Sequence, residues 1–400
     1  MSEISRPSSS RINLGKRIKR HVIGQRLTFF ATSTPGLETA VRDELIRLSP
    51  TVQVTEVIRG GVTFMGRLSD LYRANLHLFC PGRILLRLAD FKATNFLQLR
   101  KRLTALPWHL YLPQAMIPGC KVRTHRSRLF HTLAIAQEIE HAITAYWQLH
   151  GRTPLATNRQ TLYVRIDQDR VSLSLDSSGA NLYRRGLKTH ATRAPLRETT
   201  AAAILQLAGY RPDRPLCDPM SGAGTFSLEA ALVAKNLAPG ARRTFPFLEW
   251  PAFQTAHWQH LLAKAAGAVK CPEHPLIWAS DIEDAAVAAL RTCVARNGLE
   301  DAVVVERRDF LDGSTRWSES GGPTGLIVLN PPYGRRLIPS GSLRFFYERI
   351  ALRLRTAFPG WRAAIIVPER ALGELFPFCA RVQAFEHGGL RLYLLMGAIP

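Results

Sequence analysis

The chain has 400 residues, 46% of them hydrophobic, and a formal net charge of +22 at pH 7 with a pI near 10.5. This length and apolar content exclude a disordered polymer and allow two or three domains with their own cores. No apolar run reaches the roughly 20 residues that cross a bilayer, and no secretory segment follows the basic N-terminus. The composition therefore predicts a globular protein with no membrane partner.

The positive charge is concentrated in the first half of the sequence. Residues 1–190 contain 29 Lys or Arg against 12 Asp or Glu, whereas residues 191–400 contain 24 against 19. Such an excess repels itself unless a polyanion neutralises it, so nucleic acid is the expected partner. We expect the first half to contact it.

Cysteine and histidine usage argues against disulfides and metal sites. The six cysteines are scattered without a Cys-x-x-Cys pair, which is typical of a reducing compartment, so we expect a cytoplasmic location. The 12 histidines show no H-E-x-x-H motif or Cys/His ligand spacing, and we expect no metal.

The first 180 residues predict a tail followed by two α+β units. Residues 1–26 are polar and basic without apolar periodicity, which predicts a disordered tail. Residues 27–67 show a strand, a helix and two alternating strands joined at "RGG", and residues 68–180 alternate helix and strand patterns. The second unit ends in a predicted hairpin that turns at Asp167-Gln168-Asp169.

The pattern changes near residue 185 to continuously apolar strands that alternate with helices. This is typical of a parallel sheet covered on both faces, so the fold class is α/β for residues 185–400. Residues 236–275 interrupt the alternation and are interpreted as an insertion. In such open sheets, ligands bind beyond the carboxyl ends of the strands.

Four clusters follow predicted strands of this region. The first is the small-residue turn "DPMSGAGT", where the backbone can approach a ligand at a helix N-terminus; it has neither a phosphate-loop ending nor the full dinucleotide fingerprint. The second is "SDIE", where an acidic residue can accept both hydroxyls of a ribose, and the third is "DF", where a carboxylate and an aromatic can hold an adenine edge. Taken singly, the first two are as well explained by a tight turn or a helix cap, and for the third a capping or salt-bridging aspartate is the better explanation.

The fourth cluster is Asn330-Pro331-Pro332-Tyr333. Two prolines cannot extend a central strand, so the preceding strand is predicted to end at Asn330. The Asn330 side-chain carbonyl and the Pro331 carbonyl can accept the two hydrogens of an exocyclic amine, while Tyr333 stacks on the base. Four clusters in this order predict a site for S-adenosylmethionine, with catalysis by positioning and electrostatics.

These motifs resemble those of class I N-methyltransferases. "TFFATSTPGLETAVRDEL", "VRIDQDRVSLSLDSSGANLYRRGLK", "APLRETTAAAIL" and the inserted "NLAPGARRTFPFLEWPAF" further resemble THUMP-containing RNA guanine-N2 methyltransferases, especially the bacterial 23S rRNA enzymes. The resemblance covers roughly residues 27–400. It implies a ferredoxin-like domain at 27–67, a THUMP RNA-binding domain at 68–180 and a Rossmann-like methyltransferase domain at 185–400.

The resemblance also implies roles for individual residues. Asn330, Pro331, Pro332 and Tyr333 would hold the target base. Asp281, with Ile282 beside it, would bind the ribose of S-adenosylmethionine, and Asp309, with Phe310, the adenine. The methionine side of the cofactor would be bound by Asp218, Pro219, Ser221, Gly222, Gly224 and Thr225. Some relatives carry a second methyltransferase domain, and a chain that ends at Pro400 is expected to have a single activity.

Several substrates remain open at this point. The Asn-Pro-Pro-Tyr motif also serves adenine-N6 and glutamine-N5 methylation, so it does not select guanine. The expected substrate is a guanine of large-subunit rRNA, and tRNA is the alternative. A non-catalytic RNA-binding or ribosome-assembly factor is the rival from another class, and the intact Asn330 and Asp281 argue against it.

Overall fold

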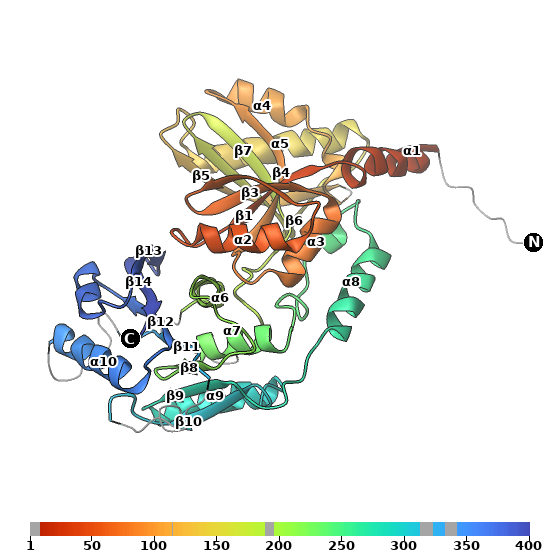
Figure 1. Cartoon of the computed structure of the whole chain (residues 1–400). Coiled ribbons are helices and arrows are strands. Elements are labelled where there is room, and N and C mark those ends of the chain that lie inside the picture. Colours follow the sequence, from red (N-terminus) through yellow and green to blue (C-terminus); the bar gives the residue numbers. More distant parts are fainter. Residues whose placement is uncertain (1–8, 114, 189–195, 313–322, 333–341) are drawn as a thin grey trace, which may run out of the picture.

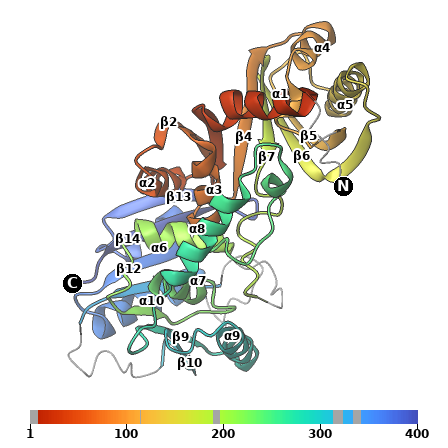
Figure 2. The same ribbon diagram turned by 90° about the vertical axis from the view of Figure 1, so that its right-hand side faces the viewer.

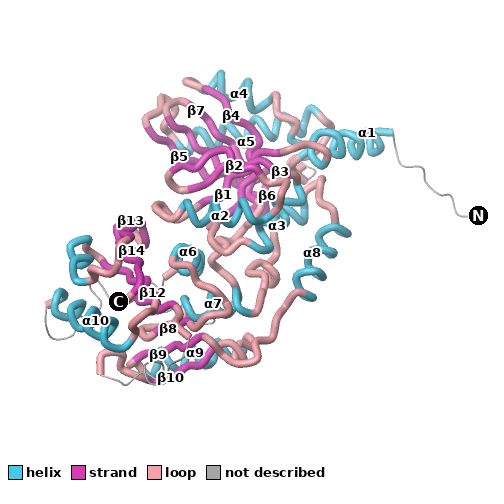
Figure 3. Tube along the Cα trace, viewed as in Figure 1, coloured by secondary structure: helices cyan, strands magenta, loops and turns pink. Residues whose placement is uncertain are grey.

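The computed structural model describes residues 9–113, 115–188, 196–312, 323–332 and 342–400. Within these residues the chain builds two seven-stranded sheets, one in each half of the sequence (Figures 1 and 3). The first sheet has the order β2 (Gln53–Ile58), β3 (Gly61–Gly66), β1 (Leu27–Thr32), β4 (Arg83–Lys92), β7 (Arg170–Asp176), β6 (Leu155–Asp167) and β5 (Met116–His125). The predicted hairpin is confirmed as β6–β7, and Gln168 and Asp169 both take the positive φ that its tight turn requires.

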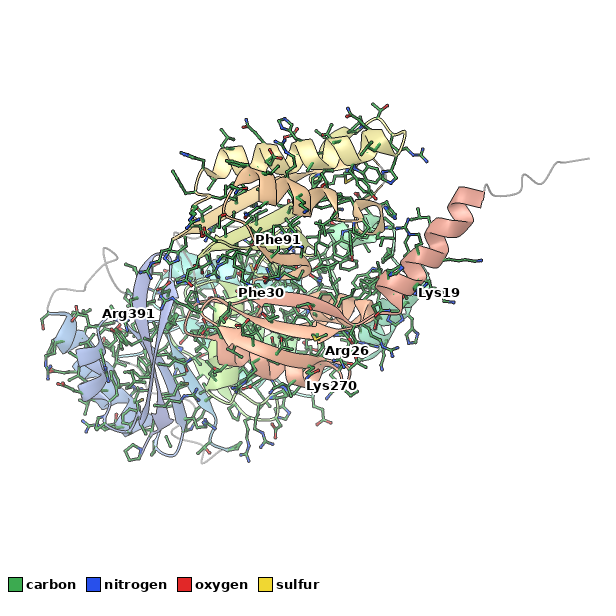
Figure 4. The ribbon with its side chains drawn as sticks, turned by 90° about the horizontal axis from the view of Figure 1, so that it is seen from above. Lys19, Arg26, Phe30, Phe91, Lys270 and Arg391 are labelled. Carbon is green, nitrogen blue, oxygen red and sulfur yellow. The ribbon has the colours of Figure 1, made fainter. Side chains whose placement is uncertain are left out.

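Alternation along the strands explains how the first sheet packs. Phe29 and Ala31 of β1 are buried in the core, whereas Phe30, on the opposite side of the strand, is half-buried and is visible from above in Figure 4. The helices of this half are α2 (Glu38–Leu48), α3 (Leu68–His77), α4 (Phe96–Thr104) and α5 (Thr132–Leu149). The sheet thus has one side buried in the core and an opposite side that is part-exposed at β1.

The predicted domain boundary at residue 67 needs correction. Strand β4 pairs with β1 on one side and with β7 on the other, so a single sheet runs through both predicted units. The order β2-β3-β1-β4 of the N-terminal unit is complete only when α3 and β4 are included. Local periodicity identified these strands but carried no information on which distant strands pair.

The prediction of a disordered tail over residues 1–26 is wrong for the part that the structure describes. Ser9–Ile18 form helix α1, and Lys19–Ile23 continue it as a π-helical segment. The chain then passes Arg26 and enters β1; Lys19 and Arg26 are labelled in Figure 4. Ile18 and Val22 are buried against the core. Their spacing of four residues is the helical signal that the high basic charge obscured.

The predicted insertion joins the two halves of the molecule. Phe247 stacks on Tyr72 of α3 with ring centroids 4.9 Å apart, and Trp258 of α8 (Thr255–Gly267) meets the same tyrosine edge-on. Helix α8 lies beside α3 (Figure 2). At Gly240, a Cβ would lie 2.3 Å from the carbonyl oxygen of Asn75, so this close approach requires glycine. These contacts fix the first half against the second.

The second sheet has the order β10 (Val303–Arg307), β9 (Ile277–Asp281), β8 (Leu216–Asp218), β11 (Leu326–Leu329), β12 (Arg362–Val367), β14 (Leu390–Ala398) and β13 (Arg381–His387). The first five strands are parallel, and β14 is antiparallel to both β12 and β13. Its helices are α6 (Glu198–Leu207), α7 (Thr225–Ala234), α9 (Asp284–Arg296) and α10 (Leu343–Ala357), besides α8.

Strand β11 shows why these strands are apolar throughout. Leu326 and Val328 are buried in one cluster with α7 and α9, whereas Ile327 and Leu329 are buried in a second cluster with α10. Both faces of the sheet are therefore covered, as predicted. From β8 the sheet continues to β9 and β10 on one side, and from β11 it continues to β12 on the other side. The strand order therefore reverses between β8 and β11, and a ligand crevice is expected beyond the carboxyl ends of these two strands. In the part of the chain that the structure describes, no helix is long and apolar enough to cross a membrane.

Candidate active site

Three polar side chains follow three neighbouring strands at this crevice. Asp281 ends β9, Asp218 ends β8 and Asn330 follows β11, and these strands are adjacent in the order β9-β8-β11. Because the three strands are parallel, the three residues lie at the same edge of the sheet. Strand β10 is parallel to β9 and next to it, so Asp309 follows the same edge. The structure thus brings together all four predicted clusters through strand pairing that the sequence did not specify.

The small-residue turn after β8 is shaped by its glycines. Gly222 and Gly224 have φ values of 50° and 69°, a region that residues with a side chain rarely adopt. A Cβ on Gly224 would also lie 2.2 Å from Leu290 of α9. Ser221 N–H donates to the carbonyl of Ser280 over 2.9 Å, which fixes the turn against the end of β9.

Asp218 is buried beneath this turn. Its Oδ2 accepts hydrogen bonds from the Ser227 hydroxyl at 2.6 Å and from the Ser227 amide at 3.3 Å, so it holds the first turn of α7. Burial raises the pKa of Asp218 to about 7, and the charge of Asp281 adds to the increase while the bonds from Ser227 oppose it. Asp218 therefore positions the turn.

Asp281 connects the first and second clusters. One carboxylate oxygen accepts the Gly222 amide at 2.7 Å, and the other accepts the Glu283 amide at 3.0 Å, next to the start of α9. The side chain is part-exposed, and the neighbouring Ile282 is 57% exposed, which is unusual for a residue that only packs. The N-cap of α9 is Glu283, so Asp281 is not the helix cap itself; it closes a turn just before the helix, and its contact with the ribose stays a prediction.

The base-holding cluster begins with a buried atom that has no partner. Asn330 Oδ1 is buried and forms no hydrogen bond within the described residues. Strand β11 ends at Leu329, one residue before the end that the two prolines predicted, and Pro331 is buried while Pro332 is exposed. Tyr333 lies outside the described residues. An acceptor left unpaired away from water is destabilising, so this atom is suited to a donor on a ligand.

The third cluster makes contacts within its own turn and with the core. Asp309 Oδ1 accepts the Leu311 amide at 2.8 Å and so closes a turn after β10. The Phe310 ring is 4% exposed and packs in the second core cluster near Phe358, with centroids 6.3 Å apart. Core packing therefore uses most of this ring, and its contact with the adenine stays a prediction.

Sequence reasoning gave no role to Lys188. Its ammonium group donates to Thr225 Oγ1 at 2.6 Å and lies 3.3 Å from a carboxylate oxygen of Glu198 in α6. It thus places a cation at the N-terminus of α7, beside the small-residue turn. The one feature of the sequence that could have drawn attention to Lys188 was its place at the end of "RRGLK", in a stretch that resembles the RNA methyltransferases. No group of three or more metal-ligating side chains occurs among the residues with a described position.

Comparison with known proteins identifies the family. A family described as "RMKL-like, methyltransferase domain" matches residues 185–386, about half of the chain, and one described as "RlmL ferredoxin-like domain" matches residues 28–85. The chain belongs to the RMKL-like methyltransferase family. The second match extends beyond residue 67, in agreement with the continuous sheet. The fold is a class I methyltransferase domain preceded by a ferredoxin-like domain.

Curated relatives of this methyltransferase share most of its length. The putative RNA methyltransferase slr0064 of Synechocystis is 31% identical over 86% of this chain and 89% of its own. The ribosomal RNA large subunit methyltransferase K/L of Syntrophotalea carbinolica is 34% identical over 86% of this chain and 50% of its own. The chain therefore spans about half the length of that K/L relative.

Solved structures share both halves of this methyltransferase. SMU.472, a putative methyltransferase crystallised with SAH, superposes with a TM-score of 0.84 at 27% identity and covers 94% of this chain and 99% of its own. A protein of Listeria monocytogenes described as a predicted N6-adenine-specific DNA methylase gives 0.83 at 27%, with 99% of each chain covered. The arrangement of the two sheets is thus common to these proteins.

Proposed function

We propose that this protein transfers a methyl group from S-adenosylmethionine to the exocyclic N2 amine of a guanine in large-subunit rRNA. The observation that carries the proposal is the buried, unpaired Oδ1 of Asn330 at the end of β11, beside the cofactor turn. The name of the K/L relative and the charge excess of the first half favour rRNA as the substrate.

The residues of the turn fit the cofactor by their chemistry. The amide-rich turn with Lys188 suits the methionine carboxylate, and Asp281 suits the ribose hydroxyls, with the exposed Ile282 beside the adenine. Asp309 remains a proposed adenine contact. When bound, S-adenosylmethionine would supply a sulfonium methyl group, with S-adenosylhomocysteine as the leaving group.

Asn330 then makes the target amine a better nucleophile. The lone pair of an exocyclic amine is delocalised into the base, which makes the amine planar and unreactive. Acceptance of its two hydrogens by Asn330 Oδ1 and the Pro331 carbonyl turns the lone pair toward the methyl carbon. The new nitrogen–carbon bond forms, and the surplus proton passes to water. Tyr333 is proposed to stack on the base.

The test is transfer of tritiated methyl from S-adenosylmethionine to total RNA from cells that lack this protein, followed by separation into rRNA and tRNA and digestion to nucleosides. Label in N2-methylguanosine of large-subunit rRNA supports the proposal. Label in tRNA, or in a methylated nucleoside other than N2-methylguanosine, would change the proposed substrate while the proposal of methyl transfer to RNA would stand. Absence of label from every fraction, deproteinised precursor rRNA included, would leave a non-catalytic RNA-binding factor.

A further inference from the structure

The loop between β5 and α5, residues 126–131, exposes a large aromatic side chain. Phe130 is 59% exposed, whereas its neighbour Leu129 is 5% exposed and anchors the loop in the core. The Phe130 ring lies against His131 with centroids 4.0 Å apart. Leu133, in the first turn of α5, is 72% exposed. The loop therefore presents a flat apolar group that neither packing nor the chemistry of the methyltransferase site uses.

The neighbouring β6–β7 turn fixes the shape of this loop. Asp169 Oδ1 accepts the Arg128 amide at 2.7 Å, and the Asp169 amide donates to Ser127 Oγ at 3.1 Å. Thr124 Oγ1 donates to the Phe130 carbonyl at 3.3 Å. Arg126 has a φ of 44°, a strained value that this network maintains. The loop that carries Phe130 is thus preorganised before any partner binds, which lowers the entropy cost of binding.

The loop and the end of β5 before it are rich in positively charged residues, and Asp167 and Asp169 of the neighbouring β6–β7 hairpin lie beside them. Residues 121–131 contain two histidines and no Asp or Glu, together with Lys121, Arg123, Arg126 and Arg128. Lys121 and Arg123 alternate onto one face of β5, the edge strand of the sheet. Arg123 and Arg126 form no ion pair with any residue that the structure describes, while Arg128 lies 3.9 Å from Asp169.

We propose that this loop binds unpaired RNA: Phe130 stacks on an exposed base, and Lys121, Arg123 and Arg126 neutralise the phosphates on either side. The inference rests on the RNA substrate of the proposed function and adds the form of RNA and the residues that hold it. Aromatic rings with flanking cations suit single strands, because every base has a π-face whereas bases within a duplex are already stacked. The absence of acidic residues from 121–131 matches a polyanion.

The test of stacking compares variants of the full-length protein in fluorescence anisotropy with a labelled single-stranded oligouridylate and with a duplex of matched length. Phe130→Ala is expected to weaken single-strand binding about tenfold, the usual effect of losing one base–aromatic stack. Phe130→Tyr, which keeps the ring, retains affinity, and Phe130→Leu, which keeps apolar bulk alone, loses it. The matched control is Leu149→Ala, because Leu149 is 86% exposed at the other end of α5.

The test of the charges uses the salt dependence of the same binding. Arg123→Gln and Arg126→Gln are each expected to lower the slope of log affinity against log salt by about 0.7, the value for one phosphate contact on a single strand. Arg355→Gln, an exposed arginine of α10 in the second half, is the control and keeps the slope.

The outcomes separate this inference from the proposed function. Wild-type affinity in Phe130→Ala, or in Phe130→Leu, would overturn stacking even if the protein methylates RNA. Loss of affinity in Phe130→Ala with retention in Phe130→Tyr supports stacking whether or not methyl transfer is detected. The methyl-transfer assay alone decides the proposed function.

Discussion

In the second sheet, Asp218, Asp281 and Asn330 meet at the carboxyl ends of three buried strands, whereas the charged residues of the first sheet are spread over an edge strand and a loop. The difference follows from how each sheet is covered. A parallel sheet buried on both faces leaves polar side chains room only at its ends, while a sheet with an exposed side distributes them over a surface. Single substitutions should therefore have large effects at the strand ends and graded effects on the surface.

The largest effect is expected for Asn330→Ala. Loss of one positioned acceptor for the reacting amine should lower kcat by about 10²–10³-fold, the range measured for single groups that stabilise a transition state by hydrogen bonding. Affinity for RNA and for S-adenosylmethionine should stay within a few-fold, measured by anisotropy and calorimetry. Unchanged turnover would remove Asn330 from the mechanism.

Gly224→Ala should disrupt the cofactor turn. The positive φ and the approach to Leu290 together should lower the free energy of unfolding by about 2–4 kcal/mol and weaken cofactor binding. Chemical denaturation checks the first effect. The control is Gly267→Ala at the end of α8, where no atom lies within 4 Å of a new Cβ. Equal stability of the two variants would contradict the role given to Gly224.

Asp281→Ala should weaken S-adenosylmethionine binding by about 10–100-fold, because a charged acceptor for two hydroxyls and for the Gly222 amide is lost. Isothermal calorimetry measures the effect. Asp284→Ala is the matched control: Asp284 is 77% exposed three residues later and pairs with Arg307. Similar losses in both variants would indicate a general effect on this helix end instead of ribose binding.

A pH-dependent effect is expected from the buried Asp218. Its pKa, raised to about 7 by burial, means that the folded state holds a proton that the unfolded state has lost. The contribution of Asp218 to stability is therefore present at low pH and falls by about 1 kcal/mol per pH unit as pH rises from about 4 toward 7. The difference in unfolding free energy between wild type and Asp218→Asn should follow this fall. A constant difference would show that Asp218 does not titrate in this range.

The strand-end site was largely predictable from the sequence. Each apolar strand is short and ends in a recognisable turn, so Asp218, Asp281 and Asn330 could be placed before their pairing was known. The strand pairing was not predictable, because β8 lies between β9 and β11 through contacts that span up to about a hundred residues. The same limit explains the misplaced boundary at residue 67.

Some local sequence patterns fit two different structures. The Phe310 ring follows a carboxylate, as an adenine contact would, and it also lies in the second core cluster, so the pattern alone does not decide between a ligand contact and core packing. Residues 9–23 have the charge of a disordered tail, yet Ile18 and Val22 are sufficient to dock a helix. Lys188 went unnoticed because its partners Thr225 and Glu198 are distant in sequence.

The most direct test of the account is a steady-state comparison of two variants in methyl transfer to RNA: Asn330→Ala, and the combined Lys121→Gln, Arg123→Gln and Arg126→Gln. The account predicts that Asn330→Ala lowers kcat with KM for RNA nearly unchanged, and that the triple variant raises KM, increasingly with salt, with kcat nearly unchanged. A loss of kcat in the triple variant at saturating RNA, or a KM effect alone in Asn330→Ala, would contradict the division of binding and chemistry between the two sheets.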